Sequence, residues 1–238
     1  MIWLARARGG ATAYLHCLTL TPELESSQQP IPRGRHAPPL EVRLEVQKHR
    51  LFDAAAAVFS RVGYADASAE AISRQAGMSK ATFYEHFANK EECLIALFEH
   101  ATASLVEELV SASRGAERTF EERHSAGLRA ILAAIEDNPA IAQAILVETV
   151  GAGPRLAELR TATLNGFAQV MYDQTVKAAE RTGGPAYASP DEAFAIVGAT
   201  FELVSRQLRT GQPERVTDLQ PLVERLILGL LMQPPHAS

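Results

Sequence analysis

The 238-residue sequence lacks several features that mark common classes of protein. Its two cysteines, Cys17 and Cys93, lie far apart without metal-ligand spacing, so a reduced cytoplasmic protein with no metal site is expected. No run of about eighteen apolar residues occurs, so no membrane span and no membrane partner are expected. The seven histidines are dispersed, and neither a glycine-rich phosphate loop nor a nucleophile motif is present. These absences argue against an enzyme, and no cofactor is expected.

Charge is distributed unevenly along the chain, which has a formal net charge of −5. Residues 1–90 hold 11 Lys and Arg against 8 Asp and Glu, whereas residues 91–238 hold 12 against 20. An acidic segment repels nucleic acid, and a basic one attracts it. The asymmetry therefore suits a DNA-binding N-terminal part attached to a remainder that does not bind DNA.

Hydrophobic periodicity and chain breakers divide the sequence into four segments. Residues 1–39, rich in Pro, Gly and Gln toward their end, are predicted to be a poorly ordered extension, and residues 233–238 a frayed tail. Residues 40–90, called the head below, are predicted to hold three helices, the first ending at Gly63. Residues 91–232, called the body, lack any alternating strand pattern. Their Pro and Gly breaks predict helices near 90–112, 119–136, 139–149, 154–182, 190–210 and 217–232. The predicted fold class is all-α, with about nine helices.

The segment 71–87 is predicted to form two short helices joined by a tight turn. Each helix has one apolar stripe of residues four apart, Ile72 with Ala76 and Phe83 with Phe87, so both face a shared core. Gly77 lies between them, and glycine takes the left-handed backbone of such a turn without strain. This pattern is typical of a helix-turn-helix that presents its second helix to a DNA major groove.

Polar side chains are predicted to cover the outer face of the second helix. Ser79 can cap its first turn, because a serine hydroxyl accepts a hydrogen bond from an unpaired N–H two or three residues later. The two inward phenylalanines turn Thr82, Glu85 and His86 outward and place Tyr84 on the flank. An acid such as Glu85 repels phosphate unless it accepts from a cytosine amino group. The helix is only two turns long, which suits a probe rather than a structural element.

The head resembles the N-terminal domain of the tetracycline-repressor-like (TetR) family. The resemblance covers about fifty residues, with the pattern Phe59-x3-Gly63-Tyr64-x3-Ser68-x3-Ile72-x4-Gly77-Met78-Ser79-Lys80-x-Thr82-x-Tyr84-x-His86-Phe87-x2-Lys90-Glu91. It implies an N-terminal helix-turn-helix domain and a C-terminal helical ligand-binding and dimerisation domain. It further implies that DNA phosphates are held by Ser68, Ser79, Lys80, Tyr84 and Lys90. It also implies that bases or backbone are faced by Thr82 and His86.

The body contains more apolar residues than a thin helical bundle needs. Most of them are expected in the core, but the resemblance implies a ligand cavity among helices 119–136, 139–149 and 154–182. The predicted lining residues are Phe120, Leu128, Ile131, Glu148, Phe167, Met171 and Tyr172. Glu148, Asn165 and Tyr172 are the possible polar anchors for an unknown small hydrophobic or amphipathic effector.

The last two helices carry apolar faces that are too broad for one neighbour. The residues predicted to form a dimer interface there are Phe194, Val197, Phe201, Leu222, Leu226 and Leu230. Gly198 would allow close approach of another helix, so an isologous four-helix bundle between two copies is expected. Because one short recognition helix buries too little surface to specify an operator, two-fold pairing on a palindromic double-stranded site is also expected.

The predicted function is that of a homodimeric, sequence-specific transcriptional regulator, most simply a repressor that a small ligand releases from DNA. Two alternatives stay open from the sequence. The first is a DNA-binding protein without an inducer, which would have a fully packed body. The second is an enzyme or small-molecule binding protein that uses the helical body and keeps the head as an anchor.

Overall fold

A computed structural model describes residues 39–112 and 119–231, with all side chains in these ranges except that of Phe120. These residues form nine α-helices and one short 3-10 helix, and none of them forms a strand, as the all-α prediction expects. The helices are α2 (Leu40–Asp66), α3 (Ala69–Gln75), α4 (Lys80–His86), α5 (Lys90–Ala112), α6 (Phe120–Asp137), α7 (Pro139–Leu146), α8 (Pro154–Thr182), α9 (Pro190–Thr210), η1 (Val216–Leu219) and α10 (Gln220–Leu231). None of the described helices is both long and apolar enough to span a membrane.

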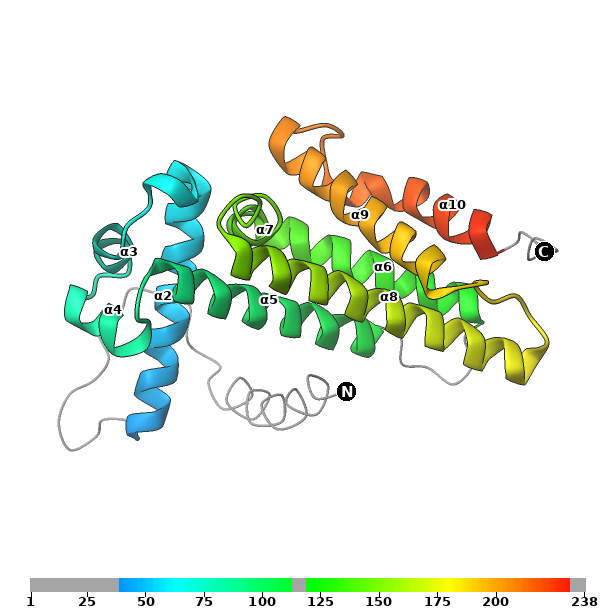
Figure 1. Ribbon diagram of the computed structural model, residues 1–238, viewed down its shortest axis with the longest axis horizontal. Coiled ribbons are helices and arrows are strands. Elements are labelled where there is room, and N and C mark those ends of the chain that lie inside the picture. The colour runs from blue at the N-terminus through cyan, green and yellow to red at the C-terminus, as the bar shows by residue number, and fades with distance from the viewer. Residues whose placement is uncertain (1–38, 113–118, 232–238) are drawn as a thin grey trace.

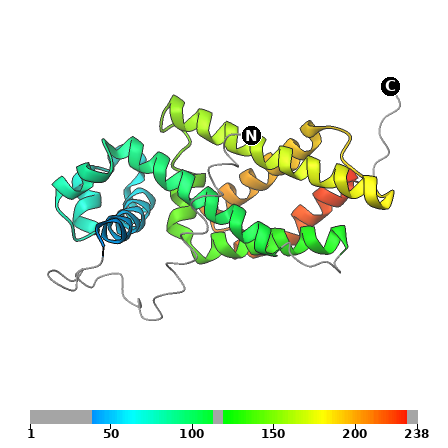
Figure 2. The ribbon, with the colours of Figure 1, turned by 90° about the horizontal axis from the view of Figure 1, so that it is seen from below.

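The head and the body lie end to end. Figure 1 shows α2, α3 and α4 at one end of the molecule, with the helices of the body extending away from them. The long helix α5 starts beside the head and runs along the body, as both views show (Figures 1 and 2). The predictions for residues 1–38 and 233–238 lie outside the described residues.

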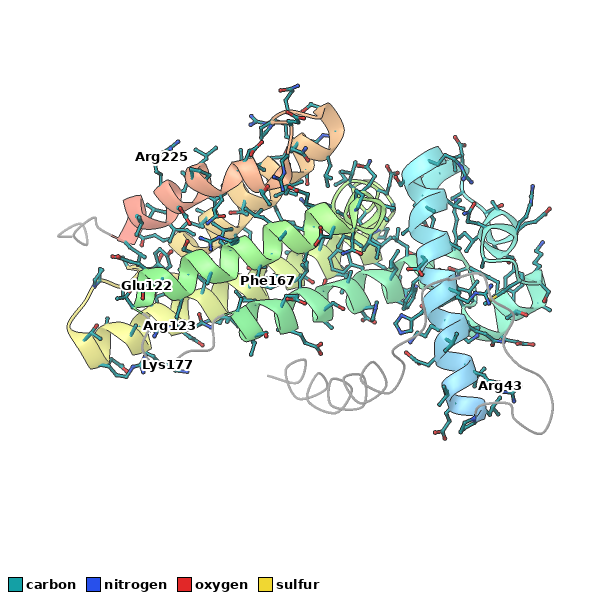
Figure 3. All side chains as sticks on the ribbon, turned by 180° about the vertical axis from the view of Figure 1, so that it is seen from behind. Arg43, Glu122, Arg123, Phe167, Lys177 and Arg225 are labelled. Atoms are coloured by element: carbon teal, nitrogen blue, oxygen red, sulfur yellow. The ribbon has the colours of Figure 1, made fainter. Side chains whose placement is uncertain are left out.

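Helix α2 is interrupted at Gly63, where the sequence predicts its end. Gly63 has φ 78° and ψ 161°, a backbone conformation that side-chain-bearing residues rarely adopt, and one further turn follows as far as Asp66. The stripe Leu51, Ala55, Val58 and Phe59 is fully buried, whereas Val62 is 41% exposed. The other end of α2, which carries Arg43, projects beyond the helix-turn-helix (Figure 3).

Local capping groups explain where most helices of the body begin. Prolines stand in the first turns of α7, α8 and α9, where the missing N–H leaves no helical hydrogen bond unmade. Thr119 and Glu122 form a reciprocal capping box at the start of α6. Two boundaries differ from the prediction. Helix α7 ends at Leu146 and continues as hydrogen-bonded turns, and η1 precedes α10, so that α10 starts only at Gln220.

Helix α7 connects the core of the head to that of the body. It packs against α2 on one side and against α9 on another. Its buried residues are Ala142, Ala144, Ile145 and Leu146; all four belong to one continuous apolar cluster, and two are alanines. Because alanine side chains allow close approach, α7 can contact two helices at once.

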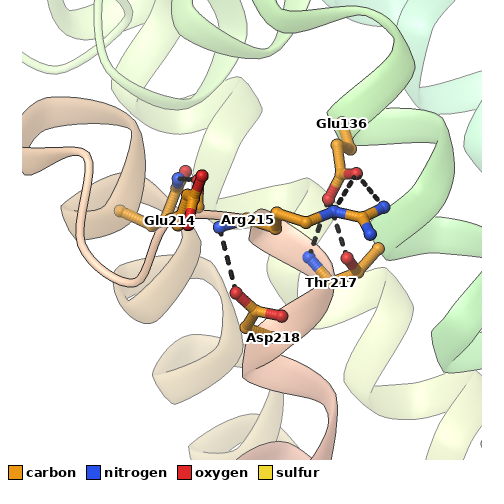
Figure 4. A network of polar contacts seen from close by, with 6 residues as sticks. Glu136, Glu214, Arg215, Thr217 and Asp218 are labelled. Atoms are coloured by element: carbon orange, nitrogen blue, oxygen red, sulfur yellow. Dashed lines mark hydrogen bonds and ion pairs between the residues drawn. The ribbon is translucent and has the colours of Figure 1, made fainter.

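The carboxylate of Glu136 attaches the segment before α10 to the C-terminal end of α6 (Figure 4). It accepts hydrogen bonds from the Thr217 backbone N–H at 3.0 Å, from Thr217 Oγ1 at 2.8 Å, and from Arg215 Nε at 2.9 Å. The N–H and hydroxyl of Thr217 and the guanidinium of Arg215 lower the pKa of Glu136 to about 2. These bonds fix η1 against α6, and so fix the start of α10.

We expect Glu136→Gln to lower the melting temperature at neutral pH, because the variant loses the ionic part of these hydrogen bonds. The folded-state pKa is depressed, so the carboxylate stabilises the fold fully above its ordinary pKa of 4.5 and loses this effect as the pH falls toward 2. Melting curves of both proteins between pH 7 and pH 2 should therefore converge at the acid end. A difference that stays constant over this range would contradict the assignment.

Candidate functional site

The turn between α3 and α4 has the geometry that the sequence predicts. Gly77 has φ 65°, and the Met78 N–H donates to Ser73 O at 2.9 Å, which closes the end of α3. Arg50 of α2 donates from Nη2 to Ala76 O at 3.3 Å. The turn is thus held both by its own backbone and by a side chain of the first helix, and α4 has one defined orientation on the head.

Exposed serine hydroxyls cap the first turns of α3 and α4, which confirms the cap predicted at Ser79. Ser68 Oγ accepts from the Ala71 N–H at 3.1 Å, and Ser79 Oγ accepts from the Thr82 N–H at 3.0 Å. Thr82 Oγ1 lies 2.9 Å from Ser79 Oγ. Helix N-termini carry a partial positive charge and unpaired N–H groups, so both ends are suited to an anion such as a phosphate.

The outer face of α4 is exposed in part. Phe83 and Phe87 are buried beneath it, at 0% and 5% exposure. Lys80 and Glu85 are exposed, and Tyr84 is 51% exposed with its ring edge against Phe83. The predicted burial of Phe83 and Phe87 and the exposure of Glu85 are confirmed, whereas Thr82 is half-buried. The exposed part of this face offers one cation, one phenol and one acid.

His86 lies less far out than the sequence predicts. Its side chain is half-buried, and Nε2 is 3.3 Å from Gln47 Oε1 of α2. Burial is the main cause that lowers the pKa of His86 below its ordinary value, and nearby charges act in both directions. The ring is therefore neutral near pH 7 and has a partner within the protein.

Lys90 has a structural role that the sequence does not reveal. Its Nζ donates to the carbonyl oxygens of Tyr64, Ala65 and Ala67 at 2.8, 2.8 and 3.0 Å. An ammonium group has three N–H donors, and all three are used here. The predicted phosphate contact is corrected accordingly: in this arrangement Lys90 has no donor left for DNA, and it closes the end of α2.

Glu148 also belongs to the junction of head and body rather than to a ligand cavity. Its Oε2 accepts from the Tyr64 N–H at 2.9 Å, and its Oε1 accepts from Gln143 Nε2 at 3.3 Å. A Cβ on Gly63 would lie 3.4 Å from the same carboxylate, so the glycine also leaves room for this contact. The predicted role of Glu148 as a polar anchor for an effector is corrected.

A cavity of about 400 Å³ lies inside the body, between α5, α6, α7, α8, α9 and α10. Four of the predicted lining residues, Leu128, Ile131, Phe167 and Met171, do line it. Tyr172 does not line it, and Phe120 lies outside the described side chains. Figure 3 shows Phe167 in the middle of the body, with Arg123 and Lys177 toward the end far from the head. The volume falls within the ~300–1,000 Å³ that is typical of small-molecule sites.

Two residues predicted for a dimer interface belong to this cavity instead. Val197 is only 7% exposed, and both Val197 and Phe201 line the cavity together with other α9 residues. Helix α9 packs against both α8 and α7. Phe194 and Leu226, at 37% exposure each, and the half-buried Leu222 and Leu230 do not line the cavity.

Sequence reasoning missed the lining residues of α5 and the polar residues at one end of the cavity. Those of α5 are Leu105 and Leu109, and the polar ones are Arg123, His124, Gln174, Lys177 and Arg181. Burial, and then the charge of Arg123, lowers the pKa of His124 to about 4, so this imidazole is neutral near pH 7. The sequence held a signal for the polar residues of α8, because they continue the helical spacing of the predicted lining residues. Residues three or four apart on this face are Phe167, Met171, Gln174, Ala178 and Arg181.

Comparison with known proteins identifies the head. Residues 51–97, which include the exposed helix α4 and its capped turn, match the family of bacterial regulatory proteins named tetR. The head is TetR-like. The chain is 35% identical over 60 residues to the fatty acid metabolism regulator protein of Bacillus subtilis (strain 168), a match that covers 25% of this chain and 31% of that protein. The curated relatives are thus matched over less than a third of their length.

Solved structures share the fold of most of this chain. The fatty acid degradation regulator FadR from Bacillus halodurans has a TM-score of 0.70 and 23% identity, and the match covers 79% of this chain and 97% of that one. The transcriptional regulator FadR from Bacillus subtilis, solved in complex with stearoyl-CoA, has a TM-score of 0.67 and 19% identity, and the match covers 79% and 99%. At identities this low, the TM-scores show a common fold of head and body and nothing further.

We expect Lys90→Met to destabilise the protein by ~1–3 kcal/mol, because three carbonyl groups lose their charged donor. Lys80→Met is the matched control, since Lys80 is exposed on α4 and its loss should change the free energy of unfolding by less than ~0.5 kcal/mol. Urea denaturation followed by circular dichroism measures both. Equal stabilities of the two variants would contradict the capping role of Lys90.

Proposed function

We propose that the protein is a homodimeric transcriptional repressor that binds a palindromic DNA site through α4 and leaves it when a small ligand occupies the body cavity. The observation that carries this proposal is the outer face of the head. There, Lys80 and Tyr84 stand exposed beside two helix N-termini whose caps, Ser68 and Ser79, are themselves exposed.

DNA recognition would begin with the phosphates. Lys80 supplies a charge, Tyr84 a phenolic O–H, and the N-termini of α3 and α4 supply backbone dipoles. Such contacts position a helix without reading sequence. Thr82 and Glu85 are then the side chains of α4 placed to reach base edges. Lys90, whose three N–H donors are all used within the protein, and His86, which is half-buried with Nε2 beside Gln47 Oε1, are left out of the proposed contacts.

Dimerisation would use the outer faces of α9 and α10. Leu222 and Leu226 share one side of α10, and Phe194 lies exposed near the start of α9. Exposed large apolar side chains grouped on two neighbouring helices favour burial against a second copy. A dimer places two α4 helices on one DNA duplex, which supplies the contact area that a seven-residue helix lacks.

Ligand release requires a connection between the cavity and the head, and α7 supports one. Leu146 of α7 lines the cavity, and its carbonyl accepts from Ser205 Oγ of α9. Two residues later, Glu148 accepts from the Tyr64 N–H at the end of α2. A ligand that displaces α7 would therefore shift the support of the head, provided that it binds one arrangement better than the other. The complex of the similarly folded FadR of Bacillus subtilis with stearoyl-CoA supports an amphipathic ligand.

We expect Lys80→Ala to weaken binding to a duplex selected from random sequences, and to reduce the slope of log affinity against log salt by about 0.9, since one phosphate contact is lost. Tyr84→Phe removes an uncharged donor and should lower affinity with little change in slope. Fluorescence anisotropy at several salt concentrations separates the two effects. Arg129→Ala, on the exposed surface of α6, is the control and should match the wild type. An unaltered slope for Lys80→Ala would remove α4 from the phosphate contacts.

We expect Leu226→Glu to yield a folded monomer with much weaker specific DNA binding, because pairing would bury an unpaired carboxylate at a cost of several kcal/mol. Leu228→Glu is the matched control: it has similar exposure, at 39% against 37%, but lies on the other side of α10 beside α6. Sedimentation velocity and DNA titration measure assembly and binding. A dimeric Leu226→Glu variant with wild-type affinity would overturn the proposed interface.

A further inference from the structure

The charged residues that line the body cavity are all of one sign. The charged residues among the described ones that line it are Arg123, Lys177 and Arg181, and all three are basic. This is the reverse of the surrounding body, where acidic residues outnumber basic ones by 20 to 12 over residues 91–238. The remaining lining is almost entirely aliphatic or aromatic. A purely apolar ligand gives no reason for cations at the cavity, whereas an anion does.

The three basic residues lie at the same end of the cavity. Along the chain, the lining residues of α8 change from apolar to basic, whereas those of α6 change from basic to apolar. Along α8 the lining runs from Phe167, Val170 and Met171 through Gln174 to Lys177 and Arg181. With a rise of ~1.5 Å per residue, the two cations stand roughly 15 and 21 Å beyond Phe167 along the helix axis. Along α6 the order is reversed, and Arg123 in its first turn precedes the apolar lining residues (Figure 3).

The chemistry of this end is that of a binding site for an anionic head group. Lys177 and Arg181 are exposed, and neither forms an ion pair with a carboxylate of the described residues. His124, which lines the same end, has its pKa lowered to about 4, mainly by burial and then by the charge of Arg123, so it adds no charge there near pH 7.

We propose that the cavity binds a long aliphatic chain with an anionic head group, with the chain against α8 near Phe167 and the head group between Lys177, Arg181 and Arg123. This proposal rests on the proposed ligand-responsive function and names the ligand class and its orientation. The anion is either a carboxylate or the phosphate of an ester, since guanidinium and ammonium groups bind both. A purely structural role, in which the cations only complement the C-terminal dipole of α8, predicts no preference among head groups.

The test measures ligand binding directly, on the full chain and without DNA, by isothermal titration calorimetry. Hexadecanoate and hexadecanoyl-CoA are the anionic probes, hexadecanol the neutral one, and hexadecyltrimethylammonium the cationic one. We expect at least one anionic probe to bind wild type roughly tenfold or more tightly than hexadecanol, the size of one charge-assisted hydrogen bond. Binding of only one anionic probe identifies its head group as the ligand chemistry. Equal binding of anionic, neutral and cationic probes, or binding of none, overturns the proposal.

Two sets of variants locate the head and the chain. Lys177→Gln with Arg181→Gln should remove the preference for the anionic probe and leave hexadecanol binding unchanged. Arg206→Gln with Arg209→Gln, which removes the same charge from exposed sites on α9 outside the cavity, should keep the preference. Met171→Gln should weaken both probes. Retention of the preference in the Lys177 and Arg181 double variant overturns the proposed head-group site.

The ligand-binding test and the test of the proposed function can fail independently of each other. Absence of any binding to duplex DNA would reject the repressor and leave the calorimetric result standing. Normal DNA binding together with failure of all aliphatic probes would reject only the ligand class.

Discussion

The end of α2 is the point on which the arrangement of head and body depends. Gly63 breaks the helical hydrogen bonding, so the following N–H and carbonyl groups need partners from elsewhere in the chain. The carbonyls receive the ammonium group of Lys90, and the Tyr64 N–H receives the carboxylate of Glu148. One partner comes from the start of α5 and the other from the turns after α7. The hydrogen bonds that satisfy the interrupted end of α2 thereby fix α2, α5 and the turns after α7 relative to one another.

Local structure could be predicted from the sequence because its causes lie within a few residues. The serine caps of α3 and α4 act across three residues, the turn at Gly77 across five, and the first-turn prolines within their own helices. The junction could not be predicted in this way. The bonds from Lys90 and Glu148 to Tyr64 span 26 and 84 residues, and nothing in local periodicity distinguishes them from solvent-facing charges.

The cavity was predicted in part, for a related reason. An excess of apolar residues on the helices now seen as α6 and α8 indicates buried volume, and Leu128, Ile131, Phe167 and Met171 follow from it. An apolar stripe does not show whether its neighbour is a cavity or a second molecule, so Val197 and Phe201 of α9 were assigned to the wrong surface. The basic residues at one end of the cavity were not predicted, because surface charges are common and only the fold brings these residues of α6 and α8 to the same cavity.

Helix α5 has a geometric consequence of its own. It begins at Lys90, which closes the end of α2, and 19 residues later Leu109 lies in the cavity wall. At ~1.5 Å per residue, these two points are roughly 28 Å apart on one rigid rod. A tilt of about two degrees about the cavity end therefore carries the head through about 1 Å, which exceeds the ~0.5 Å range over which an N–H···O bond keeps its length. The angle of α5 in the body therefore determines the position of the head.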